Sequence, residues 1–100
     1  MGAPDLRPPI RVRVPDHVVY REFPEQSVVL NLERGHYHGL NRSASVMFAL
    51  LASGETLAAV SQQMSKRYRL SPAQAERDVS RLCESLLERG LFERVEPTRA

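Results

Sequence analysis

The sequence predicts an α+β fold of the winged-helix type, in which a three-stranded antiparallel sheet is followed by three helices. Two observations lead to this prediction. Before Asn41, β-branched and aromatic runs alternate with turn residues, whereas after Asn41 the apolar residues recur at helical spacing. The connections between the expected strands are also short, and short connections favour an antiparallel meander.

The three expected strands lie between residues 18 and 40. The first, residues 18–22, ends at a Phe-Pro-Glu-Gln turn. The second, residues 28–32, has alternate apolar side chains on one face. These side chains are Val28, Leu30 and Leu32. The third strand, residues 36–40, follows a tight turn in which Gly35 is free to take a positive φ.

Each expected helix begins at a residue that can cap it. Asn41 and Thr56 carry side-chain oxygens that can accept from the exposed amides of the first turn. The first helix stops at Gly54. The apolar stripe of the first helix is Ala44, Met47, Phe48 and Leu51, and that of the second is Leu57, Val60, Met64 and Tyr68.

The third helix has the clearest signals. Ser71, Pro72 and Gln74 combine an N-cap serine, a proline in the first helical position and a capping-box glutamine. Gly90 is a left-handed stop, after which Leu91 can fold back in a Schellman motif. The expected buried stripe is Ala75, Val79, Leu82 and Leu86, flanked by Cys83 and Leu87.

We divide the chain into three parts. Residues 1–15 are expected to be a flexible arm because of their prolines, with a short edge strand possible over residues 10–14. Residues 16–95 form the folded domain and end in a short strand over residues 92–95. Residues 96–100 are a polar tail.

Composition restricts the classes of function. Apolar residues make up 42% and charged residues 26%, which is ordinary for a globular domain, and the net charge is only +2. This weak basic bias does not favour a nucleic-acid partner. No segment is apolar for long enough to span a membrane, and no signal peptide precedes the domain, so we expect a cytoplasmic protein.

No residue pattern indicates catalysis, a metal or a cofactor. The single cysteine, Cys83, falls on the apolar flank of the third helix, where a buried and unreactive thiol is expected. His17, His36 and His38 could in principle form a metal site, but no Cys, Asp or Glu lies near them at ligand spacing. The glycines are isolated and form no phosphate loop. We therefore expect neither an enzyme nor a metal protein.

Two surface features remain, and each has two interpretations. Arg77 and Arg81 are four residues apart and repel each other mildly, so they form either a solvated face or a site for a negative partner. The strand over residues 36–40 has no proline or lysine to block its edge. Either it stays open for strand addition by a peptide, or the segment over residues 10–14 covers it.

Several segments occur in an order and spacing that together cover about three-quarters of the chain. They are Asp16-His17-Val18-Val19, Val28-Val29-Leu30-Asn31-Leu32, the run from Gly35 to Asn41, Arg67-Tyr68, Asp78-Val79 and Gly90-Leu91. In this order, residues 17–93 resemble the PqqD-like family, the RiPP recognition elements that bind leader peptides. Within the family, the chain is most similar to the stand-alone elements of lasso-peptide clusters.

The resemblance implies a mechanism of peptide binding. The leader of a precursor peptide would add as an antiparallel strand to the third strand and lie in a groove against the third helix, with a leader tyrosine and proline in apolar pockets. The implied site residues are His36, Tyr37, His38, Gly39 and Leu40 on the strand and Arg77, Asp78, Arg81, Leu82, Ser85 and Leu86 on the helix. Leu82 and Leu86 could equally be structural. The implied partners are the precursor peptide, a separate leader peptidase and, as a further candidate, a cyclase.

Two other functions are consistent with this fold. A winged-helix DNA-binding protein would place the third helix in the major groove, but four carboxylates on that helix oppose phosphate binding. They belong to Glu76, Asp78, Glu84 and Glu88. An accessory subunit would stabilise an enzyme without contacting its peptide substrate.

Overall fold

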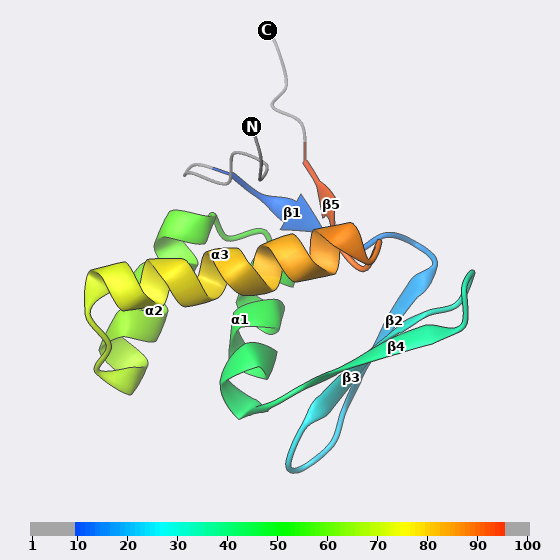
Figure 1. Ribbon diagram of the computed structural model, residues 1–100, viewed down its shortest axis with the longest axis horizontal. Coiled ribbons are helices and arrows are strands. Elements are labelled where there is room, and N and C mark those ends of the chain that lie inside the picture. Colours follow the sequence, from blue (N-terminus) through cyan, green and yellow to red (C-terminus); the bar gives the residue numbers. More distant parts are fainter. Residues whose placement is uncertain (1–9, 96–100) are drawn as a thin grey trace, which may run out of the picture.

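The structure, a computed structural model, describes residues 10–95 and has the predicted α+β architecture. A three-stranded antiparallel sheet packs with one face against the helices, and the helices all lie on that side of the sheet (Figure 1). In chain order the elements are β1 (Val12–Arg13), β2 (Val18–Glu22), β3 (Ser27–Asn31), β4 (His36–Leu40), α1 (Arg42–Ala52), α2 (Leu57–Tyr68), α3 (Pro72–Glu88) and β5 (Glu93–Arg94).

The sheet has the order β2-β3-β4, but its buried face is not the most apolar one. Val29 is fully buried, together with the polar side chains of Ser27 and Asn31 on the same face of β3. Val28 and Leu30 occupy the opposite face and are half-buried, and Leu32 is exposed beyond the strand end. The polar residues tolerate burial because they are hydrogen-bonded.

These hydrogen bonds join the sheet to its neighbours. The Ser27 hydroxyl lies 3.0 Å from the Tyr20 hydroxyl and accepts from the Ser45 hydroxyl at 2.9 Å. Asn31 Oδ1 accepts from the backbone amides of Glu33 and Arg34. The turn after β3 then closes with Gly35 at φ 73°, as the sequence predicts.

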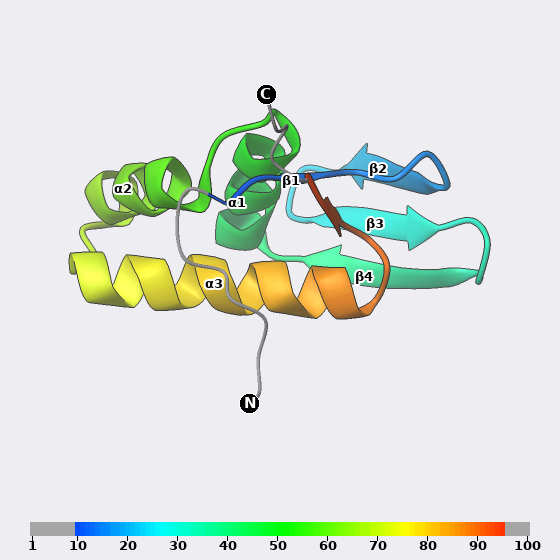
Figure 2. The same ribbon diagram turned by 90° about the horizontal axis from the view of Figure 1, so that it is seen from above.

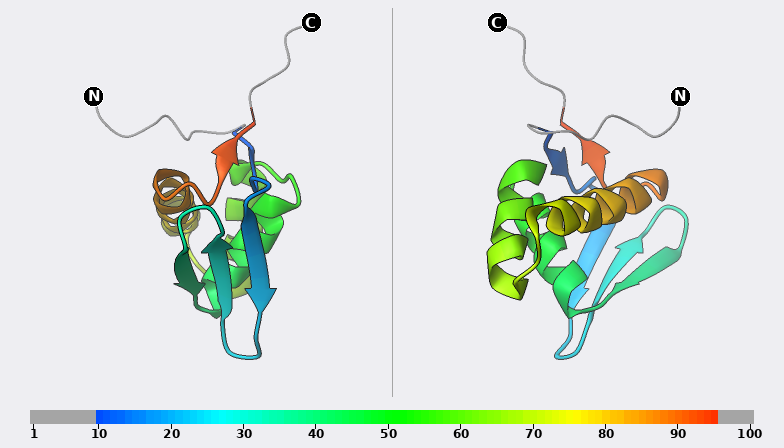
Figure 3. Two further views of the ribbon diagram at one scale, coloured as in Figure 1. Left: turned by 90° about the vertical axis from the view of Figure 1, so that its right-hand side faces the viewer. Right: turned by 60° about the vertical axis from the view of Figure 1, so that its left-hand side comes forward.

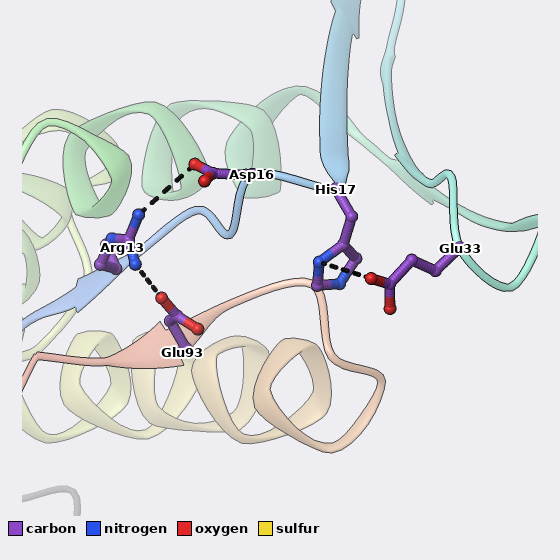
Figure 4. Close-up of polar contacts among 5 residues, drawn as sticks. All are labelled: Arg13, Asp16, His17, Glu33 and Glu93. Atoms are coloured by element: carbon purple, nitrogen blue, oxygen red, sulfur yellow. Dashed lines mark hydrogen bonds and ion pairs between the residues drawn. The ribbon is translucent and has the colours of Figure 1, made fainter.

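The short strand before the sheet pairs with the short strand after α3. β1 forms an antiparallel ribbon with β5, and Val12 at its centre is buried in the core. Arg13 forms ion pairs with Glu93 on β5 and with Asp16 (Figure 4). The short strand that was possible within the expected arm over residues 1–15 is therefore present as β1. The rest of that arm before residue 10 and the expected tail, residues 96–100, lie outside the described residues.

The predicted helix caps are present. The side chains of Asn41, Thr56 and Ser71 accept from backbone amides at 2.9, 3.1 and 3.1 Å. Gln74 does not complete a capping box, because its side-chain amide donates to Asp78 at 2.8 Å instead. That bond stays on the helix surface and holds the Asp78 carboxylate in place.

The carboxyl-terminal end of α3 is a Schellman motif. Leu91 N donates to Leu86 O at 2.8 Å, and Gly90 N donates to Leu87 O at 3.1 Å. Gly90 has φ 72°, which a side chain would make costly. The fully buried stripe is Ala75, Val79, Cys83 and Leu86. Cys83 therefore takes the place that the sequence assigned to Leu82, which is half-buried.

Three aromatic rings connect the sheet to the helical layer. Tyr20 stacks on Phe48 with centroids 4.7 Å apart, and Phe48 stacks on Phe92 at 5.1 Å. Because these rings come from β2, α1 and the segment after α3, they fix the position of α1 between the sheet and the end of the chain.

Candidate functional site

The outer edge of β4 is open. Among the described residues, β4 pairs only with β3, through the register Ser27↔Leu40 to Asn31↔His36. The segment that could have covered this edge, residues 10–14, pairs with β5 instead. Since alternate residues of an antiparallel strand direct both N–H and C=O to the same side, the edge presents a row of backbone groups to a further strand.

The carboxyl-terminal end of α3 lies near this edge of the sheet. Seen from above, α3 runs beside the sheet, with β4 as the nearest strand (Figure 2). An open hollow of about 500 Å³ lies where the start of β4 meets the end of the helix. The residues lining it are Arg34, Gly35, His36 and Tyr37 on the hairpin, and Glu88, Arg89 and Leu91 on the helix and its Schellman turn.

The five strand residues of the predicted site divide between the two faces of β4. Leu40 is buried and His38 half-buried on the face toward the helices, and the more exposed His36 is on the same face. Tyr37 and Gly39 are on the opposite, outer face, where Tyr37 is 70% exposed. A strand paired with β4 would therefore contact two different environments with alternate side chains.

His38 lies where the strand and the helix come together. Its burial lowers the pKa of the imidazole below 6.5, and the positive charge of Arg89 lowers this pKa further. The imidazole is therefore neutral at pH 7, with one nitrogen to donate and one to accept. Arg89 also lines the hollow together with His36 and Tyr37, so it is on the side of α3 that faces the start of β4.

Arg89 identifies the face of α3 that borders the open edge. Asp78, Leu82 and Ser85 are spaced four and three residues apart, and Arg89 follows four residues later, so the four residues share one flank of the buried stripe. Asp78, Leu82 and Ser85 are each half-buried. Three of the predicted helix residues therefore share the flank of α3 that leads to Arg89 and the hollow.

The remaining predicted helix residues lie elsewhere. Arg77 and Arg81 are exposed farther round the helix, and neither makes an ion pair with another described residue. Leu86 is fully buried in the core, so of the two interpretations left open, the structure supports the structural one for this residue. The sequence did not identify Arg34, Glu88 or Arg89, although Arg89 continues the spacing from Asp78.

The described residues offer little for catalysis. Burial raises the pKa of the Cys83 thiol to about 11, which leaves almost no thiolate at neutral pH. His17 lies at the amino-terminal end of β2, where its Nδ1 is 3.9 Å from the Glu33 carboxylate (Figure 4). Within residues 10–95, no three metal-binding side chains cluster, and no helix has the length and apolar character needed to cross a membrane.

Two solved structures with a similar fold are titled as leader-peptide complexes. The structure entitled "TbiB1 in Complex with the TbiA(beta) Leader Peptide" shares 26% identity and a TM-score of 0.76, covering 81% of this chain and 94% of that one. "Lasso peptide synthetase B1 complexed with the leader peptide" shares 28% identity and a TM-score of 0.77, covering 82% and 96%. No curated protein matches the sequence.

The family comparison agrees with these structures. The family described as "Coenzyme PQQ synthesis protein D (PqqD)" matches residues 26–91, a segment that includes β4, all three helices and the hollow between β4 and α3. The match spans well over half of the chain. The protein therefore belongs to the PqqD family, and it is a PqqD-like RiPP recognition element and not an enzyme.

Proposed function

We propose that this protein binds the leader of a ribosomally made precursor peptide of the lasso type and delivers it to a separate leader peptidase. A cyclase is a second candidate recipient. The observation that supports this proposal best is the unpaired edge of β4 beside α3, with a hollow between them. The similar B1 structures, which are titled as leader-peptide complexes, support the same function.

In the proposed complex the leader runs antiparallel to β4. Backbone pairing along His36–Leu40 provides sequence-independent affinity, while side chains that point inward reach the flank of α3. A groove-bound strand with two anchoring side chains typically binds with nanomolar to micromolar affinity, roughly −8 to −12 kcal/mol. The hollow beside His36 and Arg89 is a suitable place for one such anchor.

Charge around the groove favours an acidic leader. Arg34 and Arg89 line the hollow, and Arg81 is exposed on the neighbouring helix surface. Glu88 is the carboxylate on the same lining, so the local balance is positive. Guanidinium groups pair well with carboxylates in a bidentate geometry, and we propose that Arg81 and Arg89, together with Arg77, attract acidic side chains of the leader.

The test is fluorescence polarisation with a labelled synthetic peptide that spans the leader encoded beside this protein, compared with a labelled random DNA duplex. We expect saturable binding to the peptide that tolerates moderate salt and no comparable binding to DNA. Binding to DNA that weakens steeply with salt would indicate a winged-helix DNA-binding protein instead. Binding to neither probe would contradict the proposal and favour an accessory subunit.

A charge reversal tests the electrostatic part separately. Arg89→Glu places a carboxylate on the groove lining, and we expect the affinity for an acidic leader to fall roughly fivefold to thirtyfold, or about 1–2 kcal/mol. The control is Arg21→Glu, the same reversal at an exposed position on the far edge strand. Equal affinities for both variants would show that the groove charge is irrelevant. Delivery requires a cleavage assay with the peptidase, in which Arg89→Glu should slow cleavage at limiting leader concentration.

A further inference from the structure

Gly39 lies within β4, and nothing in the part of the domain that the structure describes requires a glycine there. The glycines with positive φ are Gly35, Gly54 and Gly90, so Gly39 has a backbone conformation that other residues adopt readily. A Cβ added at Gly39 would have no atom of the described residues within 4 Å. A glycine inside a strand weakens it, and often marks a place where another chain approaches closely.

The surroundings of Gly39 are apolar and open. The outer face of the sheet points away from the helices (Figure 3). Gly39 is on this face, because its neighbours His38 and Leu40 face the helices. Its cross-strand partner is the half-buried Val28, which in turn pairs with Arg21 on β2. On the same face, two residues before Gly39, is the 70% exposed ring of Tyr37. Gly39 therefore leaves an unfilled place between an aromatic side chain and an aliphatic one at the open edge.

A strand added to β4 would extend this row by one residue. Residues directly opposite in neighbouring strands project their side chains to the same face, with Cβ atoms about 4.5–5.5 Å apart. The leader residue opposite Gly39 therefore projects over the glycine, and the residue opposite His38 projects toward α3. In the antiparallel direction, the residue opposite Tyr37 comes two positions later in the leader.

We propose that Gly39 is the floor of a specificity subsite on the outer face of the sheet, which takes one large aromatic or aliphatic side chain of the leader. This side chain lies over Gly39 and packs against Tyr37 and Val28. The subsite rests on the proposed strand addition and adds to it a requirement for one outward-facing leader residue. The hollow next to Arg89 shares Tyr37 with this subsite but is otherwise lined by the hairpin and the end of α3. Leader side chains that point toward α3 alternate with those that project over Gly39, so the two sites take different leader residues.

The variants Gly39→Val and Gly39→Ala test the subsite without disturbing the free domain. Because the added atoms meet nothing and the backbone is unstrained, we expect the thermal midpoint to stay the same or rise. In the complex, however, the valine methyl groups occupy the place of the leader side chain. We expect the dissociation constant of the labelled leader peptide to rise at least about tenfold for Gly39→Val, and less for Gly39→Ala.

A matched control is Arg21→Val, which places the same side chain on the same face and in the same row, but at the opposite edge of the sheet. Its leader affinity is expected to equal that of the wild type. An alanine scan of the peptide completes the design: replacing one leader residue should weaken binding to the wild type but have little further effect on Gly39→Val. That coupling identifies the residue that lies over Gly39.

The outcomes separate the two proposals. If the wild-type protein does not bind the leader, strand addition itself is wrong. If the wild type binds and Gly39→Val binds equally well, the subsite alone is wrong. Coupling spread over many leader positions, or unfolding of Gly39→Ala, would also overturn the subsite, because both contradict an open place that takes a single side chain.

Discussion

Replacing Asn31 with alanine tests how the protein holds the turn that borders its groove. Asn31 is 2% exposed, and its Oδ1 accepts from the amides of Glu33 and Arg34 at 3.0 and 3.1 Å. Two hydrogen bonds at about 0.5–1.5 kcal/mol each give an expected loss of about 1–3 kcal/mol in the free energy of unfolding. At about 4–8 °C per kcal/mol, this loss lowers the thermal midpoint by roughly 5–20 °C.

The same substitution should also weaken peptide binding. The turn held by Asn31 carries Arg34 and Gly35, which line the hollow, so releasing the turn adds an ordering cost to binding. We expect the leader affinity to fall roughly threefold to tenfold, about 0.7–1.4 kcal/mol. Circular dichroism melting and fluorescence polarisation measure the two effects.

The control is Thr56→Ala, which removes an equivalent side-chain bond to a backbone amide at the start of α2. It should cost about 1 kcal/mol of stability and leave leader affinity unchanged. If Asn31→Ala is no less stable than Thr56→Ala and binds leader as well as the wild type, the reasoning is refuted.

Three further predictions follow from the core and the groove. Cys83, with its pKa raised to about 11 by burial, should react with a thiol reagent at pH 8 only after unfolding in urea, and rapid reaction of the folded protein would contradict this. For His38, burial lowers the pKa in the folded protein below 6.5. Near pH 6.5 the unfolded chain therefore takes up a proton at this residue that the folded protein does not. The free energy of unfolding consequently falls as the pH drops below about 6.5. Urea midpoints at pH 7.5 and 5.5 should therefore differ more for the wild type than for His38→Gln, and equal differences would argue against this role. Phe48→Ala removes the middle ring of the stack and should lower the free energy of unfolding by about 3–5 kcal/mol, as measured by urea denaturation. This is a large part of the 5–15 kcal/mol typical of a domain. A loss below about 1 kcal/mol would mean that the stack contributes little to stability.

Local signals were enough to predict the elements. The caps at Asn41, Thr56 and Ser71 and the stop at Gly90 depend on side chains and dihedral angles within a few residues, and the structure confirms each of them. The buried face of β3 could not be read in the same way. The burial of Ser27 on this face depends on the hydroxyl of Ser45, eighteen residues away, and not on apolar periodicity.

The site was predictable on the strand and less so on the helix. β4 has the predicted bounds, but the face of α3 that borders it depends on how the helix is rotated about its axis. Periodicity gave a stripe that included Leu82 and Leu86, and the rotation buries Cys83 and Leu86 while bringing Leu82 to the flank. Arg89 was missed because its role depends on proximity to His38, which only the tertiary structure provides.

β4 lacks stabilising contacts in the free domain, and a bound peptide would supply them. Its outer edge has no partner among residues 10–95, and Gly39 leaves its outer face uncovered. Burial, and after it the positive charge of Arg89, lowers the pKa of His38. An added strand pairs the edge and covers the glycine, and an acidic leader residue offsets the positive charge. Forming these contacts therefore requires little rearrangement of the free domain. At a leader concentration of 100 times the dissociation constant, binding should raise the free energy of unfolding of the domain by about 2.7 kcal/mol. We therefore expect fast amide hydrogen exchange in β4 of the free domain, where local stability is low. In the complex with the leader, exchange in β4 should be slow.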